Sequence, residues 1–322
     1  MTALLQVKNL RVSFPAGGMW KPGRKSVDGV ADVSFDVEPG ETYAVVGESG
    51  SGKTTLLRAI AGLIPSASGS VLFNGQEITG LSESEYRPLR RNISVMFQDP
   101  TGSLSPRHTV QSLLEEPYVI NNIKIPDLHA EVRRLLETVG LSADFAARYP
   151  HQLSGGQARR VGVARAIALS PKLILADEPT AGLDVSVQGE LLNLFNDLRK
   201  NLGLSMVMIT HNLNVIRHVA DRMGIMYMGR LVEEGDVREI LSAPRHPYTL
   251  CLLSANPSMD SDMRTRRVMI QGDPPSIALR PEGCEFRQRC PFAEEPLCKQ
   301  TPQWMMDDGR HGWRCLKPLS PQ

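Results

Sequence analysis

Short apolar segments separated by turn residues predict the strands of this chain. Apolar and polar side chains alternate at residues 7–14 and 33–37, a pattern typical of half-buried strands. Unbroken apolar runs predict buried strands at residues 43–46 and 173–176, and two further strands are expected at residues 92–97 and 206–210. Turn residues between strands predict two hairpins, one at Asn74-Gly75 and one at Gly229-Arg230.

Helices are expected between these strands. Helical patterns occur at residues 55–61, 186–200 and 212–220, and four apolar residues mark one helix face inside residues 101–149: Val132, Leu135, Leu136 and Val139. We interpret residues 101–149 as a helical insertion and residues 15–29, rich in Gly, Pro and basic residues, as a loop. Because strands and helices alternate, the pattern predicts an α/β fold with a mostly parallel sheet. Periodicity fades after residue 255, so a boundary is expected near Ser254.

The most distinctive polar segment follows the strand at residues 43–46. It fits G-x-x-x-x-G-K-[ST] and consists of Gly47, Glu48, Ser49, Gly50, Ser51, Gly52, Lys53 and Thr54. Between a strand and a helix, such a loop directs backbone N–H groups at phosphate oxygens, and the helix N-terminus attracts the same anion. We expect Lys53 to reach the β- and γ-phosphates, Thr54 to hold Mg²⁺, and Thr55 to belong to the same site. The alternative is a glycine-rich turn with a chance lysine.

A strand that ends in two carboxylates is the second candidate. Hydrolysis of a phosphoanhydride needs one group on Mg²⁺ and another that positions or deprotonates water. Asp177 suits the first role and Glu178 the second. Taken alone, the pair also fits a strand that ends in ordinary surface acids.

A third candidate is the segment Leu-Ser-Gly-Gly-Gln at residues 153–157, which opens a predicted helix. Ser154 is a favourable N-cap residue, and two glycines expose N–H groups at the positive end of the helix. On physical grounds alone, a second anion site and an ordinary capped helix are equally good interpretations.

Composition narrows the class of protein. The 322 residues carry a net charge of +1 and 41% hydrophobic side chains, which is ordinary for a globular protein of two or three subdomains and gives no reason to expect nucleic acid as a partner. No run of 18 apolar residues and no signal-peptide pattern occurs, so we expect a cytoplasmic protein whose membrane role depends on partners.

Four of the five cysteines lie close together near the C-terminus: Cys284, Cys290, Cys298 and Cys315. In a reducing cytoplasm this clustering favours metal or cluster ligation over disulfides. A [4Fe–4S] cluster, a Zn²⁺ ion with His311 in place of one cysteine, and unligated buried thiols all remain open on the residues alone. The fifth, Cys251, lies among leucines and is expected in the core.

The order and spacing of these segments resemble those of an ABC ATPase over roughly residues 4–250. The resemblance rests on the phosphate loop, Gln98 after a strand, the Leu-Ser-Gly-Gly-Gln segment, the carboxylates after residue 176, Asp184 and His211. It implies an α/β P-loop NTPase core with an antiparallel β subdomain, a helical subdomain insertion and a small Cys-rich C-terminal domain. The implied bounds are 1–98 and 164–254 for the core, 99–163 for the helical signature subdomain and 255–322 for the C-terminal domain.

The resemblance also implies roles for single residues. Phe14 would stack on the adenine of ATP, with an ordinary core aromatic as the alternative, and Gln98 would contact Mg²⁺. Glu178, His211 and Lys53 would be catalytic, and Asp184 would link two ATP sites. The signature residues would bind the γ-phosphate of ATP held by the opposite subunit: Ser154, Gly155, Gly156 and Gln157.

The C-terminal segment resembles the tail of ATP-binding subunits from oligopeptide, dipeptide and nickel importers. The resemblance rests on the cysteine spacing, on residues 246–249 and on residues 272–275. It implies a [4Fe–4S] cluster on the four cysteines, a second related ATP-binding subunit, two transmembrane permease subunits contacted through residues 101–117, and an extracytoplasmic solute-binding protein. The chain would then lie at the cytoplasmic face of the membrane as a peripheral subunit that hydrolyses ATP to import peptides or a related solute.

Two other functions share the same ATP chemistry. One is an ABC exporter ATPase, and the other is a soluble ABC ATPase that acts on nucleic acid or ribosomes. The sequence shows one ATPase unit without heptad repeats or a strongly basic segment, which disfavours the soluble class.

Overall fold

The computed structural model describes residues 3–15, 26–255, 268–270, 272–273, 275–307 and 309–320. The chain divides into two compact units. Unit 1 comprises Met1–Val37, Tyr43–Gly80 and Thr210–Gln322, and unit 2 comprises Glu38–Thr42 and Leu81–Ile209. No helix among the described residues is both long enough and apolar enough to cross a membrane.

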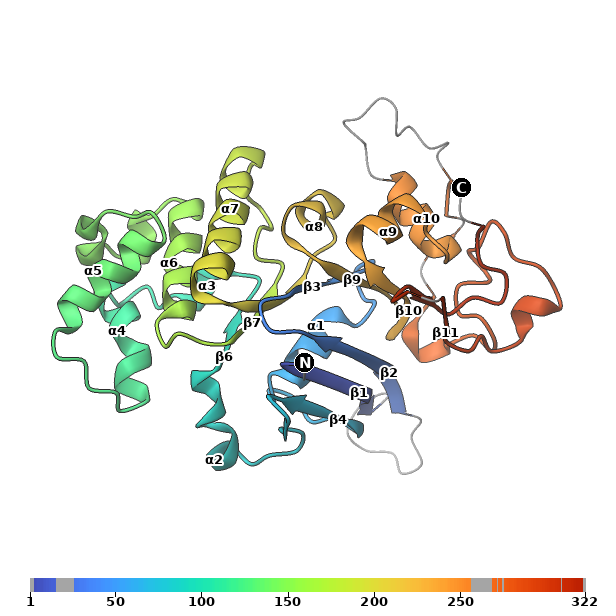
Figure 1. Ribbon diagram of the computed structural model, residues 1–322, viewed down its shortest axis with the longest axis horizontal. Coiled ribbons are helices and arrows are strands. Elements are labelled where there is room, and N and C mark those ends of the chain that lie inside the picture. The colour runs from blue at the N-terminus through green and yellow to red at the C-terminus, as the bar shows by residue number, and fades with distance from the viewer. Residues whose placement is uncertain are drawn as a thin grey trace. The chain divides into compact units, whose positions relative to one another are not determined.

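An antiparallel sheet forms the first layer of unit 1 (Figure 1). Its strands pair in the order β2 (Ser26–Val37), β1 (Leu5–Pro15), β4 (Ser68–Phe73) and β5 (Gln76–Glu77). The predicted turn between β4 and β5 is confirmed, because Asn74 and Gly75 both have positive φ angles, 51° and 79°. The sheet agrees with the antiparallel β subdomain expected from the sequence.

The expectation of a loop at residues 15–29 is wrong at both ends of that range. Pro15 pairs with Ser26, and Phe14 pairs with Val27, so β1 and β2 extend well past the alternating segments. Glycine and basic residues conceal these strand ends because the side chains there are not buried in an alternating pattern. Residues 16–25 lie outside the described part of the chain.

A mixed sheet forms the second layer of unit 1. β3 (Thr42–Val46) runs parallel to β9 (Arg222–Tyr227), which forms a hairpin with β10 (Arg230–Asp236). The hairpin turn lies at Met228-Gly229, one residue before the expected position, because these two residues adopt positive φ angles. The helices of this unit are α1 (Lys53–Ile60), α8 (Leu213–Val219), α9 (Val237–Ser242) and α10 (Pro247–Ala255).

The C-terminal segment extends this mixed sheet. β12 (Gly312–Trp313) pairs with β10, and β11 (Met305–Met306) pairs with β12. Two-residue strands leave no periodic pattern in a sequence, so neither strand is predicted from the pattern of apolar residues. Phe286 is 1% exposed and belongs to the same core as β3, β9, β10 and the helices α8 to α10, with Cys284 and Cys290 packed against it.

A parallel sheet with helices makes up unit 2. Its strands β6 (Ile93–Met96), β7 (Leu173–Asp177) and β8 (Ser205–Ile209) pair in that order. Its longer helices are α4 (Val110–Ile120), α5 (Leu128–Thr138), α6 (Gly155–Ile167) and α7 (Val185–Leu202), and its short ones are α2 (Glu83–Tyr86) and α3 (Pro100–Ser103). The predicted apolar stripe of α5 is confirmed, because all four of its residues are buried.

A separate Cys-rich C-terminal domain is not confirmed, since the C-terminal segment belongs to the same compact unit as the phosphate loop. The division into core, helical subdomain and C-terminal domain stays a prediction. The α/β character of the fold and its mixed sheets agree with the expected ATPase core.

Candidate active site

The phosphate loop connects β3 to α1 in unit 1, as the sequence predicts. A Cβ atom at Gly47 would lie 2.2 Å from the carbonyl oxygen of Met226, so only glycine fits between the loop and β9. Gly52 has a φ angle of 100°, which side chains rarely allow, and its backbone starts α1. The local geometry therefore requires glycine at both fixed positions of the motif.

Lys53 lies inside the curl of this loop. Its Nζ donates to the carbonyl oxygens of Gly47 and Glu48, both at 2.8 Å, and to Oγ of Ser51 at 3.3 Å. The side chain is 6% exposed. A buried ammonium among backbone dipoles at a helix N-terminus makes this loop a site for anions such as phosphate.

The hairpin formed by β9 and β10 is hydrogen-bonded to the phosphate loop. The N–H of Gly229 donates to the carbonyl oxygen of Ser51 at 2.8 Å, and the N–H of Ala31 donates to the carbonyl oxygen of Gly229 at 2.7 Å. These bonds connect β2, the hairpin and the phosphate loop, so the loop conformation depends on segments far apart in the sequence.

Phe14 and His211 also belong to unit 1. Phe14 is 44% exposed near the end of β1, which excludes the alternative of an ordinary core aromatic. A Cβ atom built on Gly29 would lie 2.8 Å from the Phe14 ring and 3.4 Å from Cγ2 of Thr55, so the ring lies near the start of α1. His211 is exposed and follows Thr210, whose N–H donates to the carbonyl oxygen of Val45 in β3 at 3.3 Å.

The carboxylates and Gln98 lie at one edge of the parallel sheet of unit 2. Asp177 is 5% exposed at the end of β7, and Glu178 follows it with a positive φ angle of 46°. Met96 of β6 pairs with Ala176 of β7, and exposed Gln98 follows two residues later, so Gln98 and the two acids come at the ends of neighbouring parallel strands. Amide and carboxylate oxygens are the ligands that Mg²⁺ prefers.

The Leu-Ser-Gly-Gly-Gln segment starts α6 with a reciprocal capping box. The N–H of Gln157 donates to Oγ of Ser154 at 3.3 Å, and the N–H of Ser154 donates to Oε1 of Gln157 at 3.0 Å. A Cβ atom on Gly156 would lie 2.6 Å from Cγ1 of Val187 in α7. Ser154 and Gly155 are exposed, so the positive end of α6 faces solvent.

Asp184 caps the helix beside it, because its Oδ1 accepts from the N–H of Val187 at 2.9 Å. Arg159 of α6 connects this helix to the segment between β7 and α7. It donates to the carbonyl oxygens of Ala181 at 2.6 Å and Glu178 at 3.4 Å. Burial lowers the pKa of Arg159 below its ordinary value, an effect that the charge of Asp99 opposes.

The expected site residues thus form two sets. Unit 1 holds the phosphate loop, Phe14 and His211, and unit 2 holds Gln98, the carboxylates, the signature and Asp184. Sequence reasoning missed Arg159, Tyr248 and Arg289, which support these segments through hydrogen bonds. Their contacts are long-range and no local pattern marks them, although the position of Arg159 two residues after the signature was a usable signal.

The four C-terminal cysteines are free thiols. Burial raises the pKa of Cys284 and Cys290 to about 11 and that of Cys315 to about 12, and the charges of neighbouring cysteines, Cys298 included, add to each shift. A thiolate here therefore requires nearby positive charge, which a metal centre supplies. Cys251 is fully buried, which confirms its expected place in the core.

Among the described residues, no group of three or more His, Cys, Asp or Glu side chains has the arrangement that holds a single metal ion. His311, the proposed fourth zinc ligand, has its Nε2 2.7 Å from Oε1 of buried Glu233. Each thiolate of a [4Fe–4S] cluster binds a different iron, so its ligands lie farther apart than those of one ion. Four cysteine thiols are ligands of the type that either centre uses, so the cluster and the zinc alternative both stay predictions.

Comparison with known proteins relates both regions to one family. A family model described as ABC transporter matches residues 30–181, and one described as oligopeptide/dipeptide transporter, C-terminal region, matches residues 232–298. The oligopeptide transport ATP-binding protein AppF of Bacillus subtilis is 41% identical over 302 residues, which cover 92% of each chain. The di/tripeptide transport ATP-binding protein DppF of Pseudomonas aeruginosa is 43% identical over 312 residues, 96% of each chain.

A solved structure of an ATP-binding cassette shares the fold of this chain. The ATP-binding cassette MJ0796, a dimer in a post-hydrolysis state bound to ADP and Pi, superposes with a TM-score of 0.64 at 29% sequence identity. The match covers 73% of this chain and 99% of that chain.

Proposed function

Since the chain belongs to the oligopeptide/dipeptide family of ABC transporter ATP-binding proteins, we propose that it binds ATP with Mg²⁺ and hydrolyses it to power the import of peptides. The observation that carries this proposal is the match of residues 232–298 to the C-terminal region of oligopeptide and dipeptide transporters. An exporter ATPase and a soluble ATPase share the phosphate loop, but this C-terminal match favours an importer.

Nucleotide binding is assigned to unit 1. The N–H groups of the phosphate loop and Nζ of Lys53 bind the phosphates, and the exposed ring of Phe14 stacks on the adenine. Thr54 would supply a hydroxyl for Mg²⁺, and His211 would contact the γ-phosphate. The remaining loop residues, Ser49, Gly50 and Ser51, together with Thr55, form the rest of the cradle.

Hydrolysis of ATP is assigned to residues at the carboxyl ends of the parallel strands of unit 2. Asp177 and Gln98 would hold Mg²⁺, and Glu178 would position and deprotonate the attacking water. The left-handed backbone of Glu178 supports this role, since strained residues concentrate at active sites.

A second ATP-binding subunit completes each site in this proposal. The exposed N-terminus of α6, with Ser154, Gly155, Gly156 and Gln157, binds the γ-phosphate of ATP held by the partner subunit, and Asp184 links the two sites. A relative of the same fold is a dimer bound to ADP and Pi, which supports this arrangement. The partner is a related, non-identical chain.

The complete transporter contains two permease subunits and an extracytoplasmic solute-binding protein. The helical region at residues 101–117 docks on the permeases, which places this chain on the cytoplasmic face of the membrane as a peripheral subunit. The net charge of +1 gives no support to a function on nucleic acid.

We further assign a [4Fe–4S] cluster to Cys284, Cys290, Cys298 and Cys315. Three observations support this: the thiols are free, burial and then the charges of neighbouring cysteines raise the pKa of Cys284 and Cys315, and the surrounding segment packs into the core of unit 1. The cluster would supply the positive charge that buried thiolates require.

The test of the function replaces Glu178 by Gln in the assembled transporter. Hydrolysis of ATP is expected to fall by about 10²-fold or more, because a general base contributes about that much, while ATP stays bound. Glu137→Gln, an exposed change on α5, is the matched control and should keep the wild-type rate. Both rates are measured as phosphate release with a peptide-loaded solute-binding protein present. Unchanged hydrolysis in Glu178→Gln would refute the catalytic assignment.

A further inference from the structure

The phosphate loop contains a carboxylate that phosphate binding does not require. Glu48 is the second residue of the motif, and its side chain is 24% exposed. ATP brings several negative charges to this loop. An unpaired carboxylate there would repel the phosphates and weaken nucleotide binding.

Arg289 neutralises this carboxylate from the far end of the chain. Its Nη1 donates to Oε2 of Glu48 at 2.8 Å, and its Nη2 donates to Oε1 at 3.1 Å. Parallel bonds of this kind are the strongest arginine–carboxylate geometry and fix the orientation of both groups. The side chain of Arg289 is only 7% exposed, so solvent screens the pair weakly.

The backbone around Arg289 holds its guanidinium in place. The N–H of Arg289 donates to the carbonyl oxygen of Phe286 at 2.9 Å in a turn between Cys284 and Cys290. The Phe286 ring is 1% exposed and lies against Tyr227 and Tyr248, with ring centroids 5.4 and 5.3 Å away. The position of Arg289 is therefore set by the packing of the cysteine-bearing segment.

The backbone of Glu48 is fixed from the same side. Its N–H donates to the hydroxyl of Tyr248 at 2.9 Å, and Tyr248 is fully buried in α10. Arg289 lies beside Tyr227, with 3.4 Å between Nη1 and the Tyr227 hydroxyl. Both the side chain and the amide of this loop residue are thus held by residues from the C-terminal third of the chain.

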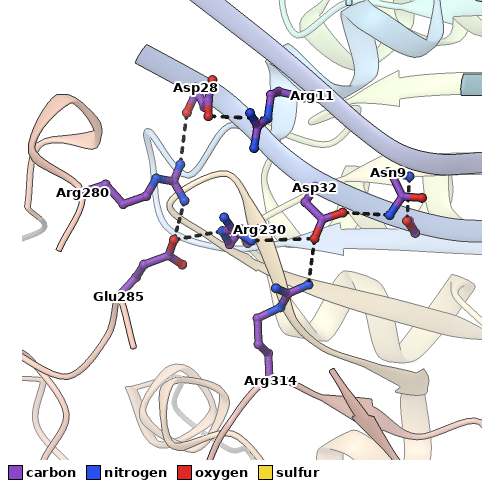
Figure 2. Close-up of polar contacts among 9 residues, drawn as sticks. Asn9, Arg11, Asp28, Asp32, Arg230, Arg280, Glu285 and Arg314 are labelled. Atoms are coloured by element: carbon purple, nitrogen blue, oxygen red, sulfur yellow. Dashed lines mark hydrogen bonds and ion pairs between the residues drawn. The ribbon is translucent and has the colours of Figure 1, made fainter. Parts of the chain in front are cut away.

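The same C-terminal segment is attached to the strands of unit 1 at other charged residues (Figure 2). Glu285, next to Cys284, accepts from Nε of Arg230 at 3.0 Å, and Arg314, next to Cys315, lies 3.5 Å from Asp32 of β2. The hydrogen bond from Asn9 and the charge of Arg314 hold the pKa of Asp32 below its ordinary value. These contacts leave the segment little freedom to carry Arg289 away from the loop.

We propose that Arg289 is a positioning residue for nucleotide binding, which cancels the charge of Glu48 and holds the phosphate loop in its binding conformation. The cysteine-bearing segment therefore sets the affinity of the loop for ATP. This inference rests on the proposed ATP binding and adds a residue outside the nucleotide motifs to it.

The test measures the Kd of Mg·AMP-PNP, a non-hydrolysable ATP analogue, by calorimetry on the full chain. Arg289→Met removes the charge and keeps most of the apolar stem. Its Kd is expected to rise about tenfold or more, because Glu48 is left as an unpaired carboxylate. Arg287→Met is the matched control: its Nη1 donates to the carbonyl oxygen of Glu282, away from the loop, and its Kd should stay within about twofold of wild type.

A double-mutant cycle separates charge from general support. In the Glu48→Gln background, Arg289→Met should weaken binding by no more than about threefold, since no carboxylate remains to be neutralised. Arg289→Lys keeps the charge without the fork and should bind more tightly than Arg289→Met. This lysine variant also carries the test if the methionine variant does not fold.

Two results would overturn the inference. One is a wild-type Kd in Arg289→Met. The other is an equal loss of affinity on Arg289→Met in the wild-type and Glu48→Gln backgrounds, which would make the arginine a purely structural support. A wild-type chain that binds no AMP-PNP would instead refute the proposed function itself, so the two failures are distinguishable.

Discussion

Glu178 illustrates how single residues at this site depart from ordinary geometry. Its φ angle of 46° is uncommon for a residue other than glycine and costs on the order of 1 to 3 kcal/mol. The surroundings maintain it, because its N–H donates to the carbonyl oxygen of Ile209 at 2.9 Å and its own carbonyl accepts from Arg159. This backbone conformation fixes the direction in which the Glu178 side chain leaves the end of β7. A fixed orientation agrees with the catalytic role proposed for Glu178.

His246 gives a prediction at the same scale. Burial lowers its pKa to about 4, and the charge of Glu233 opposes the shift only in part. The neutral ring accepts from the N–H of Tyr248 at 3.1 Å through Nδ1. Between about pH 6.5 and 4 the unfolded chain binds a proton that the folded chain does not, so stability falls as the pH is lowered through this range.

The measurement compares urea unfolding of wild type and His246→Asn at about pH 7.5 and pH 5. The wild type should lose about 2 kcal/mol more than the variant on acidification, because asparagine supplies an acceptor that does not titrate. Equal losses in the two proteins would contradict the buried neutral histidine.

At the scale of elements, the helices α6 and α7 begin with residues to which we assign functional roles. Ser154 caps α6 in a capping box, and Asp184 caps α7 through Val187. A cap is a local arrangement of a few residues, so the sequence pattern that predicts the helix start also predicts the proposed function. Gly156 is required for a different reason, because Val187 of the neighbouring helix leaves no room for a Cβ atom.

Gly162 lies in the same helix without such a reason. A Cβ atom there would meet nothing within 4 Å. Gly162→Ala should therefore raise the free energy of unfolding by about 0.5 to 1 kcal/mol, the difference in helix propensity between the two residues. Urea unfolding measures the change, with Gly156→Ala as the destabilised counterpart. A loss of stability in Gly162→Ala would show that this glycine has a packing role.

At the scale of the whole molecule, segments far apart in the sequence build unit 1. β12 extends the sheet that contains β3, and Arg289 pairs with Glu48 across 241 residues of chain. The C-terminal segment is thus part of the structure that supports the phosphate loop. These long-range contacts place residues on both sides of Ser254 in the same compact unit, while the expected boundary there stays a prediction.

The proposed cluster is tested by the iron and acid-labile sulfide content of protein purified without oxygen. About four of each per chain are expected, with loss of both in Cys315→Ser. Cys251→Ala is the matched control, because Cys251 is a core residue, and it should keep the wild-type content. Zinc without sulfide would contradict the cluster and leave the ATP site unaffected.

Local chemistry made much of the site predictable from sequence. The phosphate loop, the carboxylates at the end of β7, the helix caps and the apolar stripe of α5 all follow from residues a few positions apart, where glycine conformation, capping and periodicity decide the structure. The match to the peptide transporter family agrees with the interpretation drawn from the same motifs.

Long-range packing decided the rest. The exposure of Phe14 depends on how β1 pairs with β2, and the pairing of β10 with β12 depends on two-residue strands that no periodicity reveals. The bidentate pair of Glu48 and Arg289 joins an acid in the phosphate loop to an arginine between two cysteines. Such contacts depend on the packed core around Phe286. Only the tertiary structure therefore determined which residue pairs with the carboxylate of Glu48 in the phosphate loop.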